Sequence, residues 1–201
     1  MKRIITLILA LALTLAIPAA LISCSDDVES CYAEITVKDY GTVVVFLDAD
    51  AAPITVKNFV KLVNDGFYNG LTFHRVVENF MIQGGDPNAD GSGGSSEKIK
   101  GEFAANGYSN PISHTRGTIS MARRSDSYDS ASSQFFICNA NASSSLDGKY
   151  AAFGHVVSGM DVVDAITEET APYTDYYSGL ILIESKKPII ESIKILESYE
   201  K

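Results

Sequence analysis

The residues between Phe73 and Asp86, FHRVVENFMIQGGD, form the segment of this chain that is richest in chemical groups. If residues 71–83 fold as two strands that turn at residues 78–79, one face of the hairpin carries Arg75, Phe80, Met81 and Gln83. A guanidinium and an amide among large apolar side chains favour binding of an apolar ring together with the amide bond beside it. The alternative is structural, with Phe80 and Met81 in the core and Arg75 paired with a carboxylate.

A second pattern in this region is typical of calcium binding. Residues 86–97 match the twelve-position loop in which Asp86, Asn88, Asp90 and Glu97 would supply oxygen ligands. Such a loop needs a helix on each side, whereas the preceding residues alternate as a strand, and Gly93 stands where an apolar residue is usual. We therefore keep calcium as the minor alternative and expect neither a metal nor a cofactor.

The remaining reactive residues indicate no other catalytic centre. The chain has three histidines, His74, His114 and His155. None lies in an H-E-x-x-H motif, and no G-x-S-x-G nucleophile motif is present. The cysteines at 24, 31 and 138 lack metal-binding spacing. A disulfide between Cys31 and Cys138 is one alternative, and a buried, unreactive thiol at Cys138 is the one we favour.

Composition sets the class of protein. The 201 residues are 46% hydrophobic and 20% charged, which is typical of a globular chain that can bury a sizeable core. The net charge is −9 at pH 7. An acidic protein repels a phosphate backbone, so nucleic acid is excluded as a partner.

The N-terminus has the pattern of a secretory signal. Basic residues at positions 2 and 3 precede an apolar run from Ile4 to Ile22. The sequence Leu-Ile-Ser-Cys at 21–24 resembles the lipobox of bacterial lipoproteins, which favours a lipid on Cys24 over a transmembrane anchor. We therefore predict a signal peptide over 1–23, the lipidated Cys24 with a tether over 24–31, and a domain over 32–201. Cleavage takes the net charge to −11, and the expected location is the extracytoplasmic face of a membrane in the cell envelope.

The domain reads mainly as strands. Alternating or β-branched runs predict eight strands, at 32–37, 42–47, 71–77, 80–83, 118–121, 134–138, 152–157 and 189–196. Helical periodicity appears twice, between Pro53 and Gly66 and at 160–166. Too few helices are available to connect the strands in parallel. The sequence thus predicts a closed eight-stranded antiparallel barrel capped by two helices, which also removes exposed strand edges.

Four segments in order resemble the cyclophilin family of peptidyl-prolyl cis/trans isomerases: 73–86, ISMAR at 119–123, SQFFI at 133–137 and LDGKYAAFG at 146–154. The similarity runs from about residue 33 to residue 196, and the family fold agrees with the barrel inferred above. It implies a catalytic site of Arg75, Phe80 and Gln83. It also implies substrate contacts from Met81, Ala122, Arg123, Gln134, Phe136, Leu146 and Tyr150.

The resemblance implies a monomeric enzyme that acts on proline-containing polypeptides during folding outside the cytoplasm. The alternative is a non-catalytic chaperone or adaptor that only holds such segments. Two departures from the family pattern stand out. Ser145 replaces an aromatic residue that helps to bind cyclosporin, so weak drug binding is expected. Residues 170–188 have no family counterpart and are expected to form a longer loop with three tyrosines.

Overall fold

The computed structural model describes residues 28–200, and its strands follow the alternation of the sequence. The eight strands are β1 (Cys31–Val37), β2 (Gly41–Leu47), β3 (Thr72–Val77), β4 (Met81–Asp86), β5 (Thr118–Met121), β6 (Phe135–Cys138), β7 (Ala152–Ser158) and β8 (Ile190–Leu196). The helices are α1 (Pro53–Asn64), the single turn α2 (Ser143–Leu146) and α3 (Met160–Thr170). Short 3-10 turns occupy Ala104–Asn106, Ala171–Tyr173 and Glu184–Lys186.

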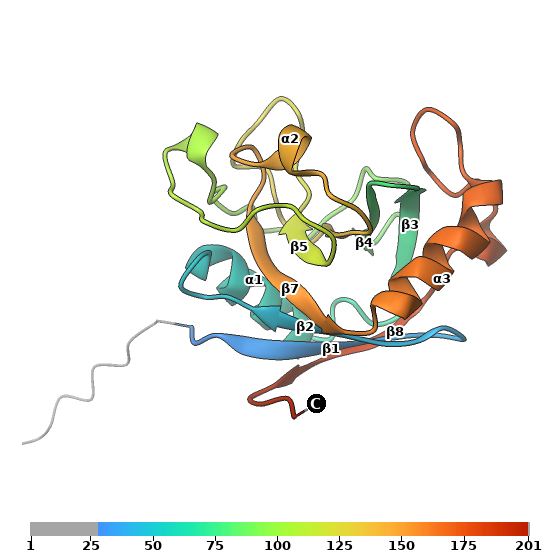
Figure 1. Ribbon diagram of the computed structural model, residues 1–201, viewed down its shortest axis with the longest axis horizontal. Helices are drawn as coiled ribbons and strands as arrows, with labels where there is room; N and C mark the ends of the chain where they lie inside the picture. Colours follow the sequence, from blue (N-terminus) through green and yellow to red (C-terminus); the bar gives the residue numbers. More distant parts are fainter. Residues whose placement is uncertain (1–27, 201) are drawn as a thin grey trace, which may run out of the picture.

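All neighbouring strands pair antiparallel in one sheet, in the order β3-β4-β6-β5-β7-β2-β1-β8 (Figure 1). The two outer strands meet through an isolated bridge between Thr72 and Ile189. The Phe73 N–H also donates to the Pro188 carbonyl at 2.9 Å. These contacts join the free edges over a short stretch only. The predicted eight-stranded antiparallel barrel with two helices is confirmed.

Strand β4 differs from its expected bounds. The sequence predicts this strand over residues 80–83. In the structure β4 continues to Asp86. A Cβ atom on Gly84 would lie 3.0 Å from the Thr72 carbonyl oxygen, and Gly85 has a φ of 81°. Gly84 therefore lets β3 and β4 pass closely, whereas Gly85 makes room for the Ser133 carbonyl, and neither glycine ends the strand.

The barrel interior is packed with aromatic rings. Phe59 of α1 lies 5.1 to 5.5 Å, between ring centroids, from Tyr68, Phe135 and Phe153. Helices α1 and α3 lie on opposite sides of the barrel (Figure 1). The N-terminus of α1 is capped from a distance, because the buried Glu102 accepts hydrogen bonds from the backbone N–H groups of residues 54 and 55 at 3.0 and 2.8 Å.

A second apolar cluster lies outside this core, on the opposite face of the same strands. Strand alternation sends Ile82 and Ile137 into the barrel, whereas Met81 and Phe136 point outward. Outward-facing residues of β4 and β6 pack with Leu146 of α2. Because side chains alternate along each strand, the outward-facing ones form the candidate site on the outer wall of the barrel.

Among residues 28–200 no helix is long and apolar enough to cross a membrane. The predicted signal peptide and Cys24 lie outside the described residues.

Cys31 and Cys138 are both free thiols, so the disulfide alternative is wrong. Cys138 is buried, and burial, with a smaller contribution from Asp147, raises its pKa to about 12. The thiol is therefore protonated and inert, as the apolar sequence around it predicts.

Candidate active site

The outward-facing cluster surrounds a hollow of about 190 Å³. Nine residues predicted from the sequence line it, namely Arg75, Phe80, Met81, Gln83, Ala122, Arg123, Phe136, Leu146 and Tyr150. They come from β3, the turn between β3 and β4, β4, β6, α2 and the segments after β5 and α2. Gln134, the tenth predicted residue, lines an adjoining hollow that shares Gln83, Ala122 and Arg123 with the first. The structure therefore brings the whole predicted set together. We call the first hollow the apolar pocket.

The hairpin of β3 and β4 places the guanidinium at this pocket. Asn79 adopts a left-handed φ of 56° at the turn, as the expected turn at residues 78–79 requires. Arg75 is paired with Gln83 across the two strands. The Arg75 Nη1 donates to the Gln83 Oε1 at 3.1 Å and lies 3.7 Å from the Met81 Sδ. Within the described residues Arg75 pairs with no carboxylate, so the structural alternative for this arginine is wrong.

Burial lowers the pKa of the Arg75 guanidinium from its ordinary value. An arginine stays charged in proteins despite such a shift, because its ordinary pKa lies far above neutrality. A positive charge that is partly withdrawn from water interacts more strongly with a nearby dipole or lone pair than the same charge on the open surface. The site thus holds a half-buried cation against an apolar wall.

Side-chain amides continue this arrangement away from Arg75. The Gln83 Nε2 donates to the Gln134 Oε1 at 2.7 Å. The Gln134 Nε2 in turn donates to the carbonyl oxygens of Gly91 and Gly93 at 3.1 and 2.7 Å. Because each amide is fixed at both ends, the chain of hydrogen bonds determines which atom of Gln83 faces the guanidinium.

The apolar wall is supported from behind by a histidine that the sequence analysis did not select. The His114 ring stacks on Phe136 at 6.0 Å between centroids and 19° between planes. Its Nδ1 lies 2.8 Å from the Asp147 Oδ1, and its Nε2 lies 3.0 Å from the Ser120 Oγ. Burial lowers the pKa of His114, with Asp147 opposing the shift, so a neutral ring supports Phe136.

Arg123 closes the pocket on another side and is engaged in packing. Its guanidinium carbon lies 4.7 Å from the centroid of the Tyr150 ring and 5.0 Å from that of Tyr128. Its Nε donates to the Lys149 carbonyl at 2.9 Å. Cation–π contacts and this hydrogen bond hold Arg123 along the aromatic rings. It therefore shapes the groove, whereas Arg75 lies within it.

The loop at 86–97 does not have the geometry of a calcium site. The Asp86 carboxylate is buried and accepts backbone N–H groups of residues 88, 90 and 91 at 2.9, 3.2 and 2.6 Å. Gly93 passes so close to Asp86 that a Cβ atom would lie 2.1 Å from its Oδ1. Across residues 28–200 no three acidic, histidine or cysteine side chains cluster as metal ligands. The segment that matches the calcium-loop pattern is thus a turn in which the Asp86 carboxylate binds backbone N–H groups.

A barrel whose outer groove combines an apolar pocket with a fixed guanidinium defines a peptide-binding enzyme of the prolyl isomerase class. The family model described as "Cyclophilin type peptidyl-prolyl cis-trans isomerase/CLD" matches residues 32–197. The chain therefore belongs to the cyclophilin-type peptidyl-prolyl cis-trans isomerases, and it has their isomerase activity.

Individual relatives agree with this assignment. Peptidyl-prolyl cis-trans isomerase A of Dickeya dadantii is 45% identical over 157 residues, which cover 74% of this chain and 80% of the relative. An isomerase of Acinetobacter baylyi is 46% identical over 160 residues, covering 77% and 80%. The crystal structure of a cyclophilin-type isomerase from Cryptosporidium parvum superposes with a TM-score of 0.72 at 27% identity, covering 85% of this chain and 100% of that one. The same protein in the presence of the dipeptide Ala-Pro gives a TM-score of 0.71.

Proposed function

We propose that Arg75 is the catalytic residue of this isomerase and that the proline ring of the substrate occupies the apolar pocket. One observation carries the assignment. The Nε and Nη1 of Arg75 have acceptors in the protein, whereas its Nη2 donates to no atom of residues 28–200. A free donor on a pocket-lining guanidinium is available to the prolyl amide beside the bound ring.

The chemistry follows from the amide bond. Resonance between the nitrogen lone pair and the carbonyl creates a rotational barrier of roughly 18 to 20 kcal/mol. As the bond twists, the lone pair localises on nitrogen and becomes a hydrogen-bond acceptor, which a guanidinium stabilises more than either planar state. Shortening an exchange time of tens to hundreds of seconds to milliseconds requires about 5.5 to 7 kcal/mol. A charge-assisted hydrogen bond and an apolar clamp supply energies of this order.

The other pocket residues have supporting roles in this proposal. Gln83 holds the guanidinium through the 3.1 Å hydrogen bond, and Phe80 contributes to the apolar surface beside it. Met81, Phe136 and Leu146, each less than 10% exposed, form the wall against the ring. Ala122, Arg123, Gln134 and Tyr150 line the groove in which the rest of the peptide lies.

The competing function is a module that binds proline-containing segments without turnover. A protease-coupled assay on an X-Pro peptide distinguishes the two, with the full chain in detergent at increasing concentration. We expect the slow cis-to-trans phase to accelerate in proportion to enzyme at concentrations far below the peptide. A slow phase that changes only when protein and peptide are equimolar would instead identify a stoichiometric binder.

We further propose that the enzyme works outside the cytoplasm, on polypeptides that fold in the cell envelope, while a lipid on Cys24 holds it at the membrane. The basic and apolar N-terminal pattern and the Leu-Ile-Ser-Cys sequence at 21–24 support this location. Diacylation supplies two chains, which is what stable anchoring requires. Membrane fractionation of the producing cell tests it, and recovery of the native chain in the soluble cytoplasmic fraction would exclude it.

A further inference from the structure

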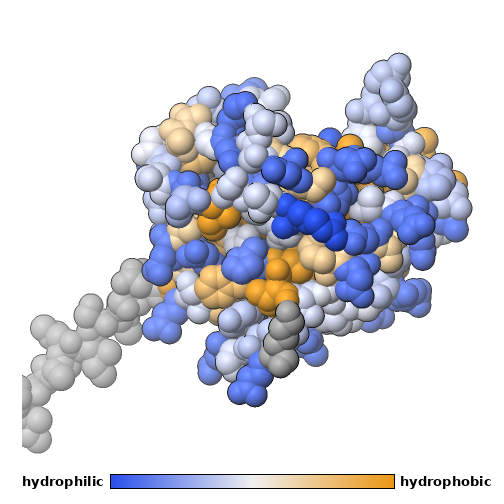
Figure 2. Space-filling view, viewed as in Figure 1, coloured by the Kyte–Doolittle hydropathy of each residue, from blue (hydrophilic) through white to orange (hydrophobic). Residues whose placement is uncertain are grey.

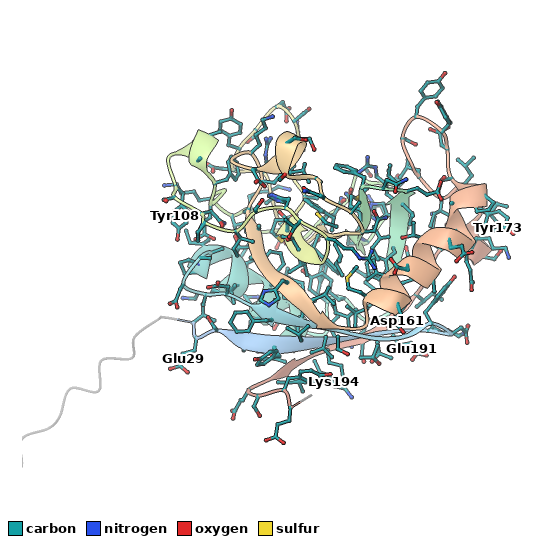
Figure 3. The ribbon with its side chains drawn as sticks, in the orientation of Figure 1. Glu29, Tyr108, Asp161, Tyr173, Glu191 and Lys194 are labelled. Atoms are coloured by element: carbon teal, nitrogen blue, oxygen red, sulfur yellow. The ribbon has the colours of Figure 1, made fainter. Side chains whose placement is uncertain are left out.

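The segment between α3 and β8 exposes an unusual share of the apolar surface. Seven large hydrophobic side chains are exposed among residues 28–200, and five lie between 176 and 189, namely Tyr176, Tyr177, Leu182, Ile183 and Ile189. The loop that begins at Tyr173 rises from the end of α3, and the side chains at its tip project away from the barrel (Figure 3). In the space-filling view it stands as a separate knob at the upper right (Figure 2).

This loop is fixed to the strand that carries Arg75. The Arg75 Nε donates to the Ser178 carbonyl at 2.6 Å, and the Val76 N–H donates to the Gly179 carbonyl at 2.9 Å. Gly179 has a φ of 73°, and a Cβ atom there would lie 2.9 Å from the Val76 carbonyl oxygen. Only glycine fits this close approach. The loop is therefore held against β3 by specific hydrogen bonds.

The base of the loop is ordered by an acidic side chain. The Asp175 Oδ1 accepts the backbone N–H of Ser178 and its hydroxyl, both at 2.8 Å, and the Tyr177 N–H at 3.2 Å. These hydrogen bonds, led by the backbone N–H of Ser178, lower the pKa of Asp175. The backbone of this turn is therefore ordered, although the side chains of Tyr176 and Tyr177 that it carries are 91% and 92% exposed.

A third hollow, of about 400 Å³, lies between this loop and β3, and it shares Arg75 with the apolar pocket. Its lining includes both exposed tyrosines, Glu78 and Asp175. We call it the tyrosine pocket. Two carboxylates and one guanidinium give its lining a net negative charge. Glu78 is exposed and has no hydrogen bond or ion pair with any residue of the described chain.

We propose that the tyrosine pocket binds a lysine or arginine side chain of the polypeptide substrate, a few residues from the proline. The proposal rests on the proposed catalytic role of the apolar pocket, because a peptide that reaches both hollows must pass Arg75. The two tyrosine rings meet edge to face, 5.2 Å apart at 88°, and so leave aromatic faces open to a cation. Glu78 supplies the opposite charge, and the net charge of −9 draws basic segments to the protein.

Matched peptides test this proposal with the full chain. Each contains one X-Pro bond and carries Lys, Gln or Glu at one position, placed one to three residues before or after the proline. At one or more of these positions we expect kcat/KM for the Lys peptide to exceed that for the Gln peptide by about tenfold at low salt, with the Glu peptide lowest. Added salt should reduce the Lys-to-Gln ratio.

Variants locate the preference. The double variant Tyr176→Ala/Tyr177→Ala and the single variant Glu78→Gln should each bring the Lys-to-Gln ratio toward one. Leu182→Ala is the matched control, because Leu182 is 70% exposed in the same segment but does not line the tyrosine pocket. It should keep both the ratio and the rates. A ratio near one at every position in the native protein, or a ratio that both variants retain, overturns the proposal.

Two further results are distinguishable from these. If no peptide is accelerated, or if Arg75→Ala is as active as the native chain, the proposed catalytic role of Arg75 has failed. If the Lys-to-Gln ratio is one and the tyrosine double variant loses sedimentation with phosphatidylcholine vesicles, the loop contacts the bilayer and the tyrosine pocket is not a peptide subsite. In the vesicle measurement the compared chains begin at residue 25, so that neither the apolar N-terminal run nor a lipid on Cys24 contributes.

Discussion

Arg75 and Gln83 lie opposite each other in the β3–β4 pairing and are joined by a hydrogen bond of 3.1 Å from Nη1 to Oε1. Both flanks of the guanidinium are thereby fixed, since its Nε is held by the Ser178 carbonyl at 2.6 Å. Only Nη2 remains without an acceptor among residues 28–200. A donor preorganised in this way stabilises a developing lone pair without further reorganisation.

The first prediction concerns this donor. Arg75→Ala should lower kcat/KM on an X-Pro peptide by about 10² to 10³, the loss typical of removing one transition-state donor. The free energy of unfolding should fall by only about 1 kcal/mol, since the protein loses hydrogen bonds at a half-exposed position. Rates come from a protease-coupled assay and stability from urea denaturation. Arg116→Ala is the control, because Arg116 is 45% exposed and pairs with Asp164 away from the site. Equal rates for the native and Arg75→Ala proteins would contradict the assignment.

Strand alternation and one turn made the centre of the site predictable. Because side chains alternate along a strand, the sequence alone placed Arg75, Met81 and Gln83 on one face once the turn at 78–79 was located. The core strands were predictable for the same reason. Alternation could not locate the end of β4, because Gly84 and Gly85 carry no side chains that could alternate between the two faces.

Contacts between distant segments were beyond sequence reasoning. The Ser178 carbonyl that holds Arg75 lies 103 residues away, and Glu102 caps α1 from a distance of 47 and 48 residues. Neither contact has a local periodicity. Each depends on how the eight-stranded sheet brings loops together, which no spacing in the sequence encodes. His114 behind Phe136 was missed because an isolated histidine has no pattern that separates support of a site from ordinary packing.

The second prediction is a stability loss in mild acid. His74 is fully buried, and neither ring nitrogen makes a hydrogen bond of normal geometry. Burial is the main cause that lowers its pKa, while Asp86 and the Thr72 backbone oppose the shift. The ordinary histidine pKa is about 6.5, so below that pH the unfolded chain binds a proton that the folded chain does not. The free energy of unfolding should therefore be constant from pH 8 to 7 and fall between about pH 6.5 and 5.

Urea titrations at each pH measure this slope. His74→Phe should reduce the slope and leave stability at pH 8 nearly unchanged, because the imidazole makes no hydrogen bond that the apolar ring would lose. Part of the dependence of stability on pH should remain in His74→Phe, because burial also lowers the pKa of His114. His155→Gln is the control at an exposed position and should retain the native slope. A native slope in His74→Phe would show that His74 is not responsible.

The third prediction concerns the small residue before Leu146. Ser145 is exposed on α2, its hydroxyl donates to the Ala142 carbonyl at 3.0 Å, and the next side chain lines the apolar pocket. A tryptophan there would add an aromatic surface beside the groove. Cyclosporin should inhibit the native enzyme weakly, and Ser145→Trp should strengthen inhibition by about 1 to 3 kcal/mol.

Inhibition constants from the peptide assay measure this effect. Ser144→Trp adds the same ring one position earlier on α2 and should change inhibition little, because helical geometry turns it away from the position before Leu146. Nanomolar inhibition of the native enzyme would contradict the prediction, since another part of the groove would then replace the missing aromatic residue.

The fourth prediction concerns Cys24 and the distance of the barrel from the membrane. Ser30 already belongs to the folded domain, because its Oγ accepts the Ala49 N–H at 2.9 Å. Only residues 25–29 then separate Cys24 from the barrel, and at about 3.3 to 3.6 Å per residue they span less than about 20 Å. The charge of −11 after cleavage repels anionic headgroups, so the domain should stand off the bilayer within this reach.

Mass spectrometry should find a mature N-terminus at Cys24 with diacylglycerol attached. Cys24→Ser should remain an uncleaved precursor, whereas Cys31→Ser should be processed like the native chain. The proposal of a lipid anchor would be wrong if Cys24 were unmodified or if the mature chain started at another residue. Neither result would affect the isomerase site.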